Sequence, residues 1–176
     1  MSYLPQSEYE ALRATIRERG TLRMCAVLGG LAAWGALAIT LLITELQGGV
    51  TLVPFMILAA TFEINFFVHT GVERIGRYIQ VAYEESAGAI GWETTAMNYG
   101  TKFPGGGLDP LFAAIFSVSA ALNFLSSLAT ATRRPGWIAL SLVTHLVFAY
   151  RIVAARKIAA AQRTIDLDRF RSLISK

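Results

Sequence analysis

Four long apolar stretches, separated by short polar segments, constrain this chain more than any other feature of its sequence. They cover about residues 24–44, 50–72, 110–131 and 136–155. The last stretch continues past Arg151, whose long side chain can reach the membrane surface. A helix needs about 20 apolar residues to cross a hydrocarbon core of about 30 Å, and three stretches meet that length outright. The sequence therefore predicts a small helical membrane protein with four transmembrane spans.

Lysine and arginine fall almost entirely on one predicted side of the membrane. Of the sixteen, fourteen lie in the N-terminal arm, in the loop between spans two and three, or in the C-terminal tail. Only Arg133 and Arg134 lie in the turn between spans three and four. Because cationic loops stay in the cytoplasm, we expect both termini there and the protein in the cell (cytoplasmic) membrane. The net charge of +4 is thus attributed to topology, and no nucleic acid partner is expected.

The polar segments complete the predicted fold. In the N-terminal arm, residues 1–23, Ser7 and Glu10 form a capping box for an amphipathic helix that Gly20 separates from span one. The second helix is expected to continue beyond the membrane to Glu85. Residues 86–109 form a glycine-rich cytoplasmic loop, expected to be irregular or only briefly structured, whose aromatic residues suit the membrane interface. The tail, residues 156–176, predicts a second amphipathic helix that is attracted to membrane lipids.

The fold class predicted from these features is all-α. It is a four-span transmembrane helical bundle made of two helical hairpins, with amphipathic cytoplasmic helices at both termini. Only 16% of the residues are charged, which is low for a soluble domain. One integral membrane domain, residues 1–176, is the simplest interpretation.

Span two carries the strongest candidate for chemistry, because an ionisable residue at the centre of a membrane costs at least about 2.5 kcal/mol. A polar stripe recurs every four residues and consists of Asn65, His69, Glu73 and Arg77, while Glu63 faces a different neighbour. In one interpretation, Glu63 and Asn65 hydrogen-bond across the bundle, and Glu73 and Arg77 form an ordinary surface pair. In the other, the stripe lines a water-filled path, a proton relay or a ligand pocket.

Span three predicts a second polar face, which serves either helix packing or the lining of a pore. Its members are Ser119, Asn123, Ser126 and Thr130. Small residues also recur four apart in span one, as Gly29 with Ala33 and Ala32 with Ala36. Such pairs favour tight contact between helices, either within the chain or between copies.

Both histidines lie in spans. His69 precedes Arg74 by five residues and His145 precedes Arg151 by six, so both are expected at a similar depth. Two imidazoles from separate helices at one depth are what bis-histidine ligation of haem b requires, and they could also bind another metal. Hydrogen bonding within the bundle is the alternative that we favour, so no cofactor is expected.

The sequence contains no serine-hydrolase, zinc-protease or nucleotide-binding motif, so an enzyme is the class of function that we favour least. Four spans enclose little volume, and a conducting path or large ligand site forms more readily between subunits. We therefore expect a non-enzymatic subunit of a membrane assembly. It is either a homo-oligomeric channel or an accessory scaffold in a larger membrane complex. A haem- or metal-binding subunit is the alternative.

Overall fold

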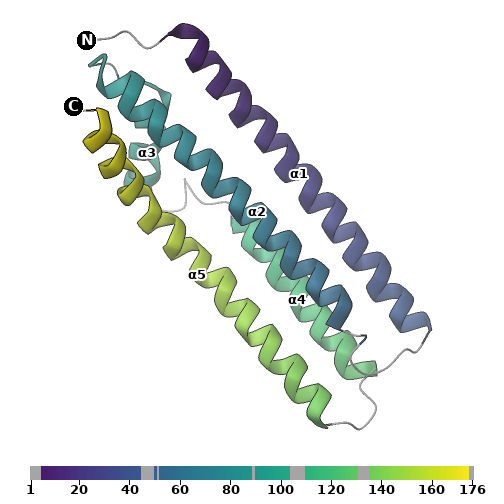
Figure 1. Cartoon of the computed structure of the whole chain (residues 1–176). Helices are drawn as coiled ribbons and strands as arrows, with labels where there is room; N and C mark the ends of the chain where they lie inside the picture. Colours follow the sequence, from purple (N-terminus) through teal and green to yellow (C-terminus); the bar gives the residue numbers. More distant parts are fainter. Residues whose placement is uncertain are drawn as a thin grey trace. The chain divides into compact units, whose positions relative to one another are not determined.

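The computed structural model is built of helices (Figure 1). It describes residues 5–44, 50, 52–88, 90–103, 110–130 and 135–174, and within these ranges it contains no strand. The elements in chain order are α1 (Gln6–Ile43), α2 (Leu52–Ile79), the π-helix η2 (Gln80–Glu85), α3 (Trp92–Lys102), α4 (Pro110–Thr130) and α5 (Pro135–Ile174). In the part of the chain that the structure describes, three helices are long and apolar enough to cross a membrane: α1, α2 with η2, and α5. The all-α class is thus confirmed, and the apolar helices indicate membrane association.

The long helices are more continuous than the sequence predicts at two places. α1 runs through Gly20, so the N-terminal arm and span one form a single helix. A glycine costs about 1 kcal/mol relative to alanine inside a helix, which a long helix tolerates. The helix also begins before the predicted capping box, since Pro5 O accepts a hydrogen bond from Glu8 N and Ser7 is already helical. The tail is likewise the continuation of α5.

Other boundaries agree with the sequence. The second helix does continue to Glu85, although its last six residues widen into η2. The loop predicted for residues 86–109 contains the short helix α3. Outside the described residues lie the turn at 45–49, the Pro-Gly run at 104–107, the predicted N-cap Asp109 and the arginine pair at 133–134.

The chain divides into two compact units, which are considered separately. The polar unit contains Met1–Arg23, Phe67–Pro110 and Lys157–Lys176, and the apolar unit contains Met24–Phe66 and Leu111–Arg156. α1, α2 and α5 each contribute to both units, because each combines a long apolar stretch with a charged one. α3 belongs to the polar unit, and α4 belongs almost entirely to the apolar unit.

The core of the apolar unit is built around aromatic rings. Phe62 of α2 packs edge-on against Phe116 of α4 and Phe148 of α5, with ring centroids 5.3 and 5.5 Å apart. α1 joins this core through Leu31 and Trp34. It approaches α2 closely at Gly30, where the backbone lies directly on the side chain of Thr61. Small residues permit this kind of backbone approach between membrane helices.

Gly30→Ala is therefore expected to destabilise the contact between α1 and α2. The new methyl group would overlap Thr61, whose hydroxyl is already held at 2.7 Å by Ile57 O. Overpacking of this kind costs about 1–3 kcal/mol. The measurement is the free energy of unfolding of the detergent-solubilised protein.

Gly29→Ala is the matched control, because a methyl group there meets nothing within 4 Å. It should leave stability unchanged or raise it by up to about 1 kcal/mol, because alanine replaces glycine inside a helix. Equal effects of the two substitutions would contradict the close approach at Gly30.

Candidate functional site: a buried polar chain and a charged cluster

Asn123 of α4 lies at the centre of a hydrogen-bonded chain inside the apolar unit. Its Oδ1 accepts a bond of 3.0 Å from the indole nitrogen of Trp34 on α1. Its Nδ2 lies 3.2 Å from Nε2 of His145 on α5. The bond from Trp34 identifies which end of the Asn123 amide is the oxygen. The amide nitrogen at the other end can only donate, so His145 Nε2 must accept. One asparagine thus connects three helices.

The remaining contacts of His145 fix its tautomer. Its Nδ1 lies 2.7 Å from Ser141 O, a carbonyl that can only accept, so the proton is on Nδ1. The ring also packs against Phe55, with centroids 4.3 Å apart. The Ser141 hydroxyl continues the chain to Ser127 at 2.8 Å. Both ring nitrogens are therefore used by a neutral imidazole.

A small cavity adjoins this chain. It is lined by Asn123, Ser126 and Ser127 of α4 and by apolar residues of α1 and α2, and its volume is about 10 Å³. That is close to the minimum for a single water molecule. The chain can fix the register of three helices and hold one water, but the cavity has no room for a larger ligand.

Glu63 and Arg151 form an ion pair between α2 and α5 that the sequence analysis did not foresee. Two guanidinium nitrogens, Nε and Nη2, each lie 2.8 Å from a carboxylate oxygen. The guanidinium also stacks over the ring of Phe66, 4.6 Å from its centroid. Glu63 does face a neighbour of its own, as expected, and that neighbour is a cation. Pairing reduces the cost of both charges within an apolar stretch.

The polar stripe predicted for span two divides between the units. Asn65 is 2% exposed in the apolar unit, and its Oδ1 has no hydrogen-bond partner among the described residues. His69 belongs to the polar unit, with Nδ1 3.4 Å from an Arg23 nitrogen and Nε2 3.7 Å from Glu73. Arg77, also in the polar unit, is only 8% exposed.

The expected surface pair of Glu73 with Arg77 is replaced by other contacts. Glu73 accepts two hydrogen bonds from Arg163 of α5, one of them 3.0 Å from Nε. Arg77 instead donates to Gln80 at 3.2 Å and reaches the sulfur of Met97 on α3 at 2.6 Å. Burial lowers the pKa of the Arg77 guanidinium from its ordinary value. The polar unit is thus held together by specific pairs between helices.

The N-terminal part of α1 is attached to the same unit. The Tyr78 hydroxyl donates to Glu8 at 2.9 Å, and burial together with that carboxylate raises the pKa of Tyr78 to about 12. Arg13 donates to Glu93 of α3 at 2.8 Å. The N-terminal part of α1 is thus bonded to both α2 and α3.

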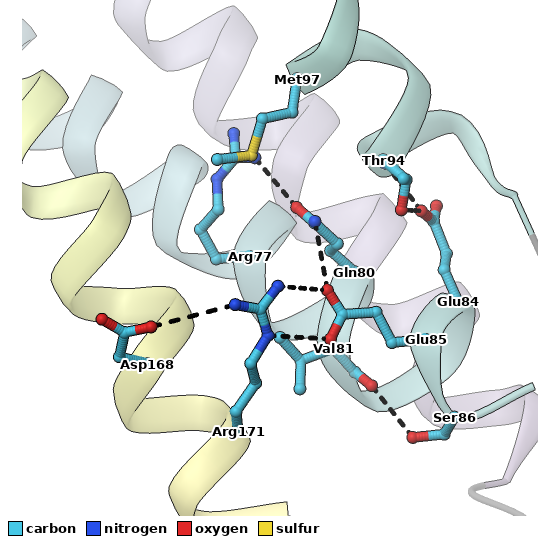
Figure 2. A network of polar contacts seen from close by, with 10 residues as sticks. All are labelled: Arg77, Gln80, Val81, Glu84, Glu85, Ser86, Thr94, Met97, Asp168 and Arg171. Carbon is cyan, nitrogen blue, oxygen red and sulfur yellow. Dashed lines mark hydrogen bonds and ion pairs between the residues drawn. The ribbon is translucent and has the colours of Figure 1, made fainter. Parts of the chain in front are cut away.

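The π-helix directs two successive glutamates to different partners (Figure 2). Glu84 accepts hydrogen bonds from the backbone nitrogens of Glu93 and Thr94, at 2.9 and 2.7 Å, and so caps the first turn of α3. Glu85 receives two bonds from Arg171, at 3.0 and 2.7 Å. A side chain at position 91 would displace the Glu84 carboxylate, because a Cβ there would overlap it. Widened π turns of this kind are common at functional positions.

The polar face of α4 differs by one position from the prediction. Ser119 and Asn123 are buried, and Ser127 rather than Ser126 continues the face. Ser126 is half-buried and donates to Leu122 O of its own helix. The side chain of Thr130 lies outside those described. Strict spacing by four residues would have identified Ser127.

The two histidines have separate partners in separate units. A metal at His145 Nε2 would have to displace the Asn123 amide. Among the described residues, no three His, Cys, Asp or Glu side chains are placed to hold a metal ion. Haem ligation by His69 and His145 stays a prediction.

Asn123→Leu is expected to destabilise the apolar unit, because it leaves Trp34 Nε1 and His145 Nε2 without partners. Hydrogen bonds between membrane helices contribute about 0.6–2 kcal/mol. Unfolding in detergent measures the loss. The Ser126→Ala control removes a hydroxyl that donates to Leu122 O of its own helix, and it should cost clearly less than Asn123→Leu. An Asn123→Leu variant as stable as wild type would rule out the chain as a source of stability.

Acidification is expected to weaken the Glu85–Arg171 pair. The bonds from Arg171 lower the pKa of Glu85, so the folded state binds fewer protons at this site than the unfolded state. The contribution is complete at neutral pH. It begins to fall as the pH drops below the ordinary carboxyl value of about 4.3, and it is gone below the lowered pKa.

The difference in Tm between wild type and Glu85→Gln should therefore shrink between pH 7 and pH 3. The ion pair should contribute at most about 1 kcal/mol to the free energy of unfolding at pH 7, since both side chains are partly exposed. Arg171→Gln should have the same effect, and the double variant should add little. A difference that is constant with pH would contradict the pairing.

Comparison with known proteins gives no function for this chain, so a function has to be argued from the contacts described above. No protein-family model matches the sequence, and neither the curated proteins nor the solved structures include a significant match.

Proposed function

We propose that this chain is an integral membrane protein with four transmembrane spans that acts as a non-enzymatic subunit of a membrane assembly. The observation that carries the proposal is the distribution of side chains in the apolar unit. Asn123, His145, Ser141 and Ser127 bond to one another in its interior, while large apolar side chains cover its outer surface. They include Leu28, Ile39, Met56, Val118, Leu122, Leu125, Val143, Leu146, Val147 and Val153, each at least half exposed. Exposed apolar surface on this scale is typical of contact with lipid or other subunits.

Helix lengths support the four spans. α4 has 21 residues, which at 1.5 Å per residue gives about 31 Å, enough to cross the hydrocarbon core. α1, α5 and α2 with η2 are longer and extend beyond it. The charge bias of fourteen cations to two supports an orientation with both termini in the cytoplasm.

The interior of the apolar unit supports a subunit more than a catalyst. Asn123, His145, Ser141 and Ser127 bond to one another, and the cavity beside Asn123 has room for about one water. A conducting path or a larger binding site would then form between copies or against another protein. The assembly is either a homo-oligomeric channel or a complex in which this chain is an accessory scaffold.

The outer surface of α1 favours assembly. Gly29, Ala32, Ala33 and Ala36 are all exposed there, although small residues in membrane helices serve close contact with another helix. Contact with a second subunit would bury them.

Native mass spectrometry of the protein extracted from its own membranes tests this function. We expect either a homo-oligomer or a complex with another protein at fixed stoichiometry. Gly29→Ile with Ala33→Ile should remove most of the assembled fraction because the larger side chains separate the helices. Ala139→Ile, at an exposed position of α5, is the control. A wild-type spectrum that contains only monomer would contradict the proposal.

A further inference from the structure

α3 has two sides of different character. Counted at 100° per residue, Trp92, Ala96, Tyr99 and the adjoining Phe103 project within about 60° of one another. We call these four residues the aromatic face. Phe103 is the C-cap residue of α3 and has an extended backbone, and its N–H still donates to Tyr99 O at 2.9 Å, which holds it at the end of the helix. The aromatic face contains no charged residue.

The other side of α3 is attached to the polar unit by three contacts. Glu84 caps its first turn, Arg13 pairs with Glu93, and Arg77 reaches Met97. An isolated helix of eleven residues is marginally stable in water, so these contacts account for its order. They also fix the rotation of the helix about its own axis, and therefore the direction of the aromatic face.

The aromatic face is exposed in the structure. Trp92 is 67% exposed, Tyr99 55% and Phe103 50%, and the rings of Tyr99 and Phe103 pack on each other with centroids 4.9 Å apart. Tryptophan and tyrosine combine an apolar ring with a polar N–H or O–H group. This combination suits the boundary between lipid and water, where one end is apolar and the other wet.

We propose that the aromatic face of α3 lies in the interfacial layer of the bilayer that α4 enters. The inference rests on the proposed membrane function. Six residues connect Phe103 to Pro110, where α4 begins, so the two ends are at most about 25 Å apart. The short connection keeps α3 close to the start of α4. The three contacts with the polar unit fix the rotation of α3 about its own axis. In this position the aromatic face of α3 links the polar unit to lipid.

The test measures the collision of a nitroxide label with oxygen, which concentrates in lipid, and with a water-soluble nickel complex. The full-length protein, with Cys25→Ser, is placed in phosphatidylcholine vesicles containing one-fifth phosphatidylglycerol. A label at Ala96→Cys reports on the aromatic face and leaves its three rings intact. Asn98→Cys lies about 130° away from the centre of that face on the same helix. Val147→Cys, 62% exposed on α5, is the reference for a span.

We expect the ratio of oxygen to nickel collisions to be several-fold higher at position 96 than at position 98, and highest at position 147. Changing Trp92, Tyr99 and Phe103 together to alanine should shift the label at position 96 towards water. If the label at position 96 collided mainly with the nickel complex while the label at position 147 collided mainly with oxygen, this inference would be overturned and the proposed function would stand. An aqueous label at 147 would overturn the proposed function itself. Equal lipid exposure at 96 and 98, or no response to the triple substitution, would overturn the aromatic face as the contact.

Discussion

An unpaired polar group in an apolar environment costs free energy, and the rest of the structure follows from avoiding that cost. Helices satisfy the backbone internally, which is why apolar stretches that cross a bilayer are helical. The same requirement applies to side chains. Asn123 satisfies Trp34 and His145 at once, and Glu63 neutralises Arg151. These contacts also specify which helices are neighbours in the apolar unit, because apolar packing alone is less selective.

The polar unit is built from the continuations of three of the same helices, α1, α2 and α5, but different contacts hold it together. Its segments are rich in charge, so ion pairs and caps replace apolar packing as the main specific contacts. Among the described residues of this unit, four carboxylates each bind a cation from another element. Glu73 from α2 binds Arg163, Glu85 from η2 binds Arg171, Glu93 from α3 binds Arg13, and Asp166 from α5 binds Arg74 of α2. Such pairs orient helices more than they stabilise them when they are partly exposed. A unit held in this way is suited to present α3 at a defined angle.

The sequence predicted the helices well because their signal is local. Runs of about 20 apolar residues identify spans, and the absence of proline between Glu73 and Glu85 correctly indicated that the second helix continues. Gly20 was misleading because tertiary context outweighs a single propensity. The partners of the polar residues were not predictable, since pairs such as Glu63 with Arg151 lie 88 residues apart. Glu84 had no sequence signal that connected it to the first turn of α3.

The four-span topology is the central claim, and α4 decides it because three helices are long and apolar enough without it. The most direct measurement is the labelling of single cysteines from each side of oriented membrane vesicles, in a protein with Cys25→Ser. Exposed positions suit this purpose: Ser7, Val50, Ala87, Gly136 and Ser172. Four spans predict that positions 7, 87 and 172 react from the cytoplasmic side and positions 50 and 136 from the other. If position 136 reacted together with position 87, and position 172 from the opposite side, α4 would not cross the membrane and the account would be wrong.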